Sequence, residues 1–123
     1  MENQKIQNSK KYDLEERCLL FAKNVRVFIG KLPRTSSNIE DSKQLVRSSG
    51  SVGANYIEAN ESLGRKDFLM RIKICRKESK ESAFWLKLVD TRGDQILEKE
   101  RQVLIQESVE LMMIFSSILI KFK

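Results

Sequence analysis

The stretch "RSSGSVGANYIEA", Arg47–Ala59, decides how the chain folds, because it reads either as a phosphate-binding loop or as a helix with a small-residue face. It contains two of the five glycines of the chain. At about 100° per residue, one helical stripe comprises Leu45, Ser49, Val52 and Tyr56, and the stripe beside it comprises Val46, Gly50, Gly53 and Ile57. The opposite side is formed by Arg47, Ala54, Glu58 and Glu61. Because this period continues through both glycines, the sequence predicts a helix.

The loop interpretations lack the context that they need. "GSVG" resembles the GxxG loop of a KH domain, but that loop needs flanking strands, and the sequence predicts none. A Walker loop requires Gly-Lys-Ser/Thr, which is missing. A glycine inside a helix costs about 0.5–1 kcal/mol relative to alanine, and close helix packing is the expected offset. We expect this packing to involve Ser49, Gly50, Gly53 and Tyr56.

The chain as a whole is predicted to be all-α and to form one domain. It has 123 residues with one proline and five glycines, which favours long uninterrupted elements. Apolar residues recur at helical spacing in four ranges, about 13–32, 38–62, 66–91 and 94–121, after a flexible basic arm at 1–11. The short connections predict an antiparallel up-down-up-down four-helix bundle.

Individual residues mark the expected helix ends. Asp13 is expected to cap the first helix, Pro33 to end it, and Gly64 to end the second. The candidate caps of the second helix are Ser36, Ser37 and Asn38.

The residue types that are absent argue against an enzyme. The chain has no histidine, which removes the usual general base and the common nucleophile pairs. Cys18 and Cys75 lie on apolar stripes without CxxC spacing, so we expect buried thiols. Salt bridges are a better interpretation than a metal site for Glu58, Glu61, Glu78 and Glu81. We therefore expect no catalytic residue, no cofactor and no metal.

The ends of the sequence favour a cytoplasmic protein. The N-terminal residues contain no apolar segment of the kind found in signal peptides. The longest apolar run, "LMMIFSSILI", is shorter than the roughly 20 residues that span a bilayer. No membrane partner is expected.

The third helical range carries most of the positive charge. The net charge of the chain is +6, and residues 65–93 carry nine Lys or Arg against four Asp or Glu. A lysine at every seventh position would recur about every 10.5 Å along the helix axis, and such a row can contact a nucleic-acid backbone. The candidate nucleic-acid-binding residues are Lys66, Lys73, Arg76, Lys77, Lys80 and Lys87. Aromatic residues are scarce on this face, so we expect backbone rather than base recognition.

Two alternatives stay open for this helix. The lysines could form a solvated face in which they pair with Glu78 and Glu81. A second apolar face suggests an interface between copies of the chain, and its residues are Met70, Ile74, Glu78, Trp85 and Leu88. The same face, together with a groove at the small residues of 47–59, could instead receive a partner protein in a scaffold that has no affinity for nucleic acid.

Several motifs occur together in this chain. They are "YDLEER" with "FAKNVRVFIGKLP" in the first helical range, Gln44-Leu45-x-Arg47-Ser48, Ser51-x-Gly53-Ala54-Asn55-Tyr56-x-Glu58-Ala59, Asp67-Phe68, Lys77-Glu78-x-x-Glu81 and Trp85-Leu86. Over about residues 12–90, these motifs closely resemble the four-helix-bundle family of 23S rRNA intervening-sequence proteins. One departure is that the family pattern leads us to expect a serine cap near Arg65, where Asp67 is expected to substitute.

The resemblance implies a bacterial, non-catalytic bundle that assembles into a ring-like homopentamer. Family genes lie in insertions within 23S rRNA genes or elsewhere as free-standing copies. In a related branch, the accessory proteins of diversity-generating retroelements, the pentamer binds nucleic acid and a reverse transcriptase. The implied partners are therefore further copies of the chain, an RNA or DNA backbone and, in that branch, a reverse transcriptase.

Overall fold

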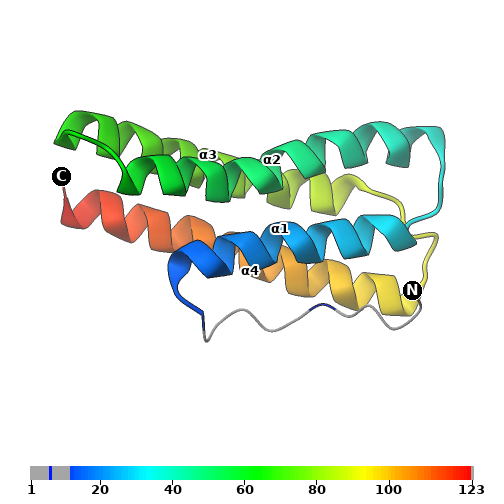
Figure 1. Cartoon of the computed structure of the whole chain (residues 1–123). Coiled ribbons are helices and arrows are strands. Elements are labelled where there is room, and N and C mark those ends of the chain that lie inside the picture. The colour runs from blue at the N-terminus through cyan, green and yellow to red at the C-terminus, as the bar shows by residue number, and fades with distance from the viewer. Residues whose placement is uncertain (1–5, 7–11, 123) are drawn as a thin grey trace.

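The computed structural model describes Ile6 and residues 12–122, and these residues form four helices and no strand (Figure 1). The helices are α1 (Leu14–Lys31), α2 (Ser36–Asn60), α3 (Arg65–Leu88) and α4 (Gln95–Lys121). The all-α prediction with four helices is confirmed. The predicted arm at 1–11 lies outside the described residues except for Ile6, which is partly buried against the core.

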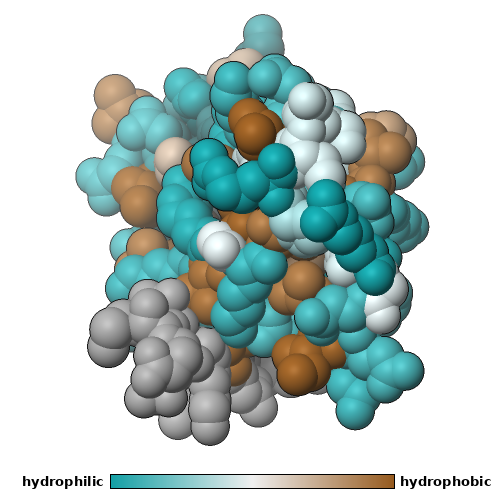
Figure 2. All heavy atoms as spheres, turned by 90° about the vertical axis from the view of Figure 1, so that its right-hand side faces the viewer, coloured by the Kyte–Doolittle hydropathy of each residue, from teal (hydrophilic) through white to brown (hydrophobic). Residues whose placement is uncertain are grey.

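Each helix packs against two others, in the cyclic order α1, α2, α3, α4 and back to α1. The α2–α3 and α3–α4 contacts are the most extensive, and α1 packs more loosely on both of its neighbours. Figure 1 shows the α1–α2 and α3–α4 connections at one end and the α2–α3 connection at the other. Figure 2 shows the end of the bundle that carries the α1–α2 and α3–α4 connections. The surface of this end is mostly hydrophilic, with scattered apolar residues.

The core lies between the four helices and is built from their apolar stripes. Its largest fully buried side chains include Phe21, Phe28, Leu45, Ile72, Leu86, Leu104, Leu111 and Phe115. Cys18 and Cys75 are free thiols within this core, as predicted. Burial raises the pKa of each thiol to about 12, so both stay protonated at neutral pH.

A charged clamp joins α1 to α4 across the looser side of the bundle. The Arg17 guanidinium donates hydrogen bonds to both carboxylate oxygens of Glu107, at 2.7 and 2.8 Å. It also donates to Glu110 at 2.7 Å. Because this paired geometry favours the charged form, the pKa of Arg17 lies above its ordinary value.

The predicted boundaries of α1 are confirmed. The Asp13 carboxylate accepts a hydrogen bond from the Glu16 backbone N–H at 2.9 Å, which caps the helix. At the other end Leu32, the residue before Pro33, has an extended backbone with ψ of 148°.

The second helix starts two residues earlier than predicted, because Thr35 is its cap. The Thr35 hydroxyl accepts from the Asn38 backbone N–H at 3.1 Å, so Ser36, Ser37 and Asn38 lie inside the first turn. The Asn38 side chain does not cap the helix; it is buried and forms hydrogen bonds with the two neighbouring connections. Its amide group donates to the carbonyls of Pro33 (2.9 Å) and Asp90 (2.8 Å), and its oxygen accepts from the Asp90 N–H (2.8 Å).

The connections on both sides of α3 also differ from the prediction. Helix α2 ends at Asn60, and Gly64 occupies the N-cap position of α3 without a side-chain cap, while Asp67 lies in the first turn. Helix α3 ends at Leu88 rather than at residue 91, because the hydrogen bonds of Asn38 hold Asp90 outside the helix. Arg92 and Gly93 then take positive φ values of 55° and 74° in the turn before α4.

The small residues of α2 lie at two different helix contacts. A Cβ atom built on Gly53 would lie 3.3 Å from the Cβ of Cys18 in α1, so the glycine permits the close approach of these helices. On the α3 side, the buried Ser48 and Ser82 hydroxyls are hydrogen-bonded at 2.8 Å. Among the residues expected to pack closely, Ser49 is buried, Gly50 is half-buried near Arg26, and the Tyr56 ring lies against Phe115.

Helix α4 is long and apolar enough to cross a membrane on length and composition alone, although a core helix of a bundle satisfies the same test. A third of its apolar window is buried inside the structure. The buried side chains that face the other helices include Leu104, Leu111 and Phe115.

The close contact at Gly53 is tested by comparing it with an unhindered glycine. We expect Gly53→Leu to lower the free energy of unfolding by about 1–3 kcal/mol, because its Cβ would lie 3.3 Å from the Cys18 Cβ and the packing of α1 must adjust to it. Gly30, with nothing within 4 Å of its built Cβ, is the matched control, and Gly30→Leu should leave stability unchanged or raise it by up to about 1 kcal/mol. Urea denaturation of both variants checks this. Equal tolerance of the two substitutions would contradict the packing role.

The buried Asn38 amide is expected to be a strong stability determinant. Asn38→Ala should lower the free energy of unfolding by about 1–3 kcal/mol, because three partly buried hydrogen bonds to the backbone of Pro33 and Asp90 are lost. The neighbouring Ser36→Ala, at an exposed position, serves as control and should change stability by less than about 0.5 kcal/mol. Similar thermal midpoints for wild type and Asn38→Ala would refute this role.

Candidate nucleic-acid interface

One face of α3 presents the cationic residues that the sequence singled out. All six are exposed, and within the described part of the chain none of their side chains is hydrogen-bonded or ion-paired: Lys66, Lys73, Arg76, Lys77, Lys80 and Lys87. Four of them come from a seven-residue repeat, so they recur about every two helical turns. The face therefore carries concentrated and unneutralised positive charge.

Two carboxylates of α3, those of Glu78 and Glu81, form ion pairs with α2 rather than with the cationic face. Arg47 of α2 contacts Glu78 at 3.3 and 3.4 Å and also pairs with Glu81. Glu78 is buried, so its charge is compensated by Arg47 rather than by solvent. The hydrogen bond to Glu78 raises the pKa of Arg47, which keeps the guanidinium charged. The alternative in which Glu78 and Glu81 neutralise the lysine row does not occur in this structure.

This arrangement corrects the predicted orientation of Arg47. The helical projection placed Arg47 on the side of α2 away from the small-residue stripes, but its long side chain reaches α3. The remaining carboxylates of residues 65–93 are also occupied, since Asp67 lies 3.9 Å from Arg71 and Asp90 accepts from the Arg92 N–H at 2.8 Å. In residues 65–93, the structure pairs no carboxylate with the cationic face.

Sequence reasoning missed an aromatic residue on this face. Phe84 is 57 % exposed and lies 18 residues after Lys66 and seven after Lys77. At 100° per residue these spacings place it within about 20° of both lysines. The expectation that aromatic residues are scarce here therefore needs correction, and the helical spacing that identified the lysines could have found Phe84.

The expected second apolar face is narrower than predicted. Met70 and Leu88 are exposed, at 47 % and 51 %. Ile74 and Trp85 are half-buried, with Trp85 packed against the core and its indole N–H 3.5 Å from Glu81. Glu78 is buried against Arg47 and does not contribute a free surface. Glu78 thus lies in the α2–α3 contact of a single chain, and Trp85 packs on the core of that chain.

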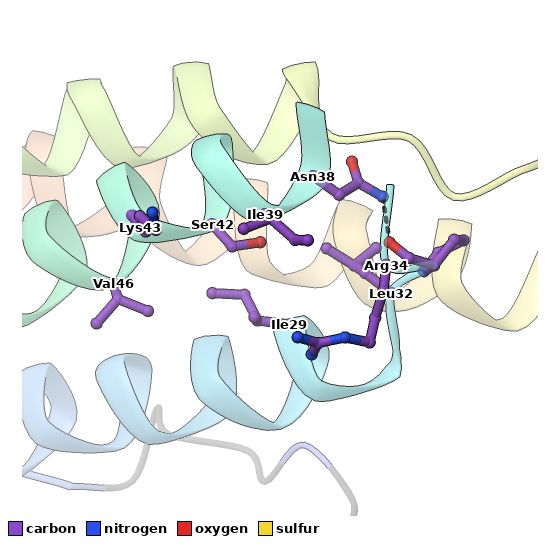
Figure 3. A pocket seen from close by; sticks show the side chains of 9 residues that line it. Ile29, Leu32, Arg34, Asn38, Ile39, Ser42, Lys43 and Val46 are labelled. Carbon is purple, nitrogen blue, oxygen red and sulfur yellow. Dashed lines mark hydrogen bonds between the residues drawn. The ribbon is translucent and has the colours of Figure 1, made fainter. Parts of the chain in front are cut away.

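A groove lies between α1 and α2, and the sequence suggested only its small-residue part. Figure 3 shows Ile29, Ile39 and Val46 between the end of α1 and the start of α2. These residues line a cavity of about 410 Å³. A second cavity of about 340 Å³ lies along the same two helices and is lined by residues that include Gly50 and Gly53. The small residues of α2 thus leave a groove as well as a close contact.

The glutamate cluster considered as a metal site is divided by the structure. Glu78 and Glu81 pair with Arg47, whereas Glu58 and Glu61 are exposed at the end of α2. Within the described residues, no three His, Cys, Asp or Glu side chains form a group able to hold a metal ion.

Fold and surface together define a small four-helix bundle with one cationic helix face. A family model described as 23S rRNA-intervening sequence protein matches residues 10–117, and the chain belongs to this family. A solved structure of a protein of unknown function, from the S23 ribosomal protein family of Bacteroides thetaiotaomicron VPI-5482, is 30% identical. The alignment covers 85% of this chain and 96% of that chain, with a TM-score of 0.74. No curated protein matches the chain.

Proposed function

We propose that this chain is a non-enzymatic, cytoplasmic nucleic-acid-binding protein that contacts the phosphate backbone of RNA through α3. The observation that carries the proposal is the exposed cationic face, whose residues are unpaired while Arg47 holds Glu78 and Glu81 away from it. Phosphate contacts of this kind give salt-dependent binding with little sequence preference. The family membership of the chain fits an RNA partner but does not identify one.

We also propose that the bundle is antiparallel and assembles into a ring-like homo-oligomer. Contacts between helix ends support the antiparallel order, since Lys31 at the end of α1 pairs with Glu100 near the start of α4 at 2.8 Å. Asn60 at the end of α2 likewise donates to Glu15 at the start of α1, at 3.4 Å. Exposed apolar residues that further copies could cover are Met70, Leu88, Ile96, Val103, Met113 and Ile120.

Charge reversal tests the backbone contact. We expect the triple variant Lys73→Glu, Lys80→Glu, Lys87→Glu to abolish RNA binding at low salt, because it replaces three phosphate-binding charges without touching the core. Fluorescence anisotropy with a labelled RNA over a salt series measures this effect, and circular dichroism confirms folding.

The matched control reverses three exposed lysines on other helices, Lys23, Lys43 and Lys99, which gives the same change in net charge. The control should retain most of the affinity. Equal losses in the two triple variants would show that net charge, rather than the α3 face, governs binding. Unchanged binding by the α3 variant would refute the assignment of the face.

A second candidate is an adaptor that binds a protein partner, a reverse transcriptase in the related branch, and has no affinity for nucleic acid. The α1–α2 groove favours it, because the groove combines exposed apolar side chains, such as Leu19 and Ile57, with little bulk at Gly50 and Gly53. This function predicts that wild-type protein fails to bind RNA at any salt concentration. RNA binding that is lost in the α3 variant would exclude it as the sole function.

A further inference from the structure

We propose that Phe84, within the cationic face of α3, is a stacking site for an unpaired base of single-stranded nucleic acid. The inference rests on the proposed function and narrows its substrate class from any phosphate backbone to strands with accessible bases. Exposed aromatic rings beside cations bind such strands because every base offers a π-face for stacking while its phosphates pair with the cations.

The position of Phe84 relative to the lysines supports this assignment. Lys66, Lys73 and Lys77 all lie within about 20° of Phe84 around the helix axis. Lys80 lies about 6 Å before it and Lys87 about 4.5 Å after it along the axis. A base stacked on the ring would therefore have cations available for the phosphates on both sides of it.

The ring also has a fixed support. The centroids of Phe84 and Trp85 lie 5.0 Å apart with an interplanar angle of 78°, an edge-on arrangement that stabilises both rings. Trp85 is itself packed against the core and near Glu81. Phe84 is therefore held in place while 57 % of it remains accessible.

The other phenylalanines do not offer the same surface. Phe21, Phe28 and Phe115 are fully buried. Phe122 is 44 % exposed, but its ring packs edge-on against Phe68, and the Lys121 ammonium lies 5.9 Å from its centroid. Phe84 is thus the phenylalanine that combines exposure with a surrounding row of unpaired lysines.

The charges around Phe84 favour a single strand over the other occupants. A duplex keeps its base faces inside the stack, so the ring would gain no stacking partner from it. If an apolar face of a second copy covered the ring, Lys73, Lys77 and Lys80 would lose their hydration. An apolar face offers no carboxylate to pair with these ammonium groups, so this packing is unfavourable. A single strand supplies both the base and the phosphates.

The test compares three probes of equal length, namely single-stranded oligouridine RNA, a fully paired RNA duplex and an abasic phosphodiester strand. We expect Phe84→Ala to weaken binding to oligouridine about 5- to 150-fold, the range for loss of one base–aromatic stack. Affinity for the duplex and for the abasic strand should stay within about twofold, and the salt dependence should not change. Phe84→Trp should retain affinity for oligouridine.

Leu63→Ala, in the connection between α2 and α3, is the control for loss of a fully exposed apolar side chain and should leave all three affinities unchanged. Thermal unfolding and light scattering accompany each variant. An equal loss on all probes, no loss on oligouridine, or an altered oligomeric state in Phe84→Ala would overturn the stacking site while the proposed function stands. Failure of the wild-type protein to bind any probe would refute the proposed function itself.

Discussion

The ion pair that Arg47 makes with Glu78 and Glu81 is the contact on which both the packing and the surface of the bundle depend. It joins α2 to α3 and compensates the charge of the buried Glu78, which would be costly to leave unpaired. It also engages the two carboxylates that lie nearest to the lysine row in sequence. Because those charges are directed toward α2, the outer face of α3 keeps its cations unneutralised. This interaction thereby leaves the outer face of α3 positively charged.

Helix α2 makes this arrangement possible because its small residues serve two neighbours. Gly53 permits close approach of α1, and Ser48 hydrogen-bonds to Ser82 of α3 at 2.8 Å. The glycines that are unfavourable in an isolated helix are offset by these contacts. The α1–α2 and α3–α4 connections lie at the same end of the bundle (Figure 1), and hydrogen bonds of Asn38 join them. Helix α3, which presents the cationic face, is thus held by α2 along its length and by Asn38 at its C-terminal end.

The sequence predicts the four helices well, because their apolar periodicity and local signals such as Asp13 and Pro33 depend only on neighbouring residues. The sequence predicts a helix end or a side-chain direction less well where a residue far away in the chain determines it. The end of α3 is set by Asn38, which lies 52 residues from Asp90 in the chain, and no local pattern shows this. The direction of Arg47 was missed because a helical projection places Cα atoms and ignores the reach of a long side chain. Phe84 was missed because the face was defined by its lysine and arginine positions, although Phe84 lies between Lys80 and Lys87 in the chain.

Zero-length photo-crosslinking of bound oligouridine, with peptide mapping by mass spectrometry, tests the central claim most directly. That claim is that the outward face of α3 binds nucleic acid because its carboxylates are held by α2. The account predicts crosslinks concentrated in the α3 peptides between Lys73 and Lys87, and few in α1, α2 or α4. Crosslinks concentrated along the α1–α2 groove, or spread evenly over the four helices, would contradict it.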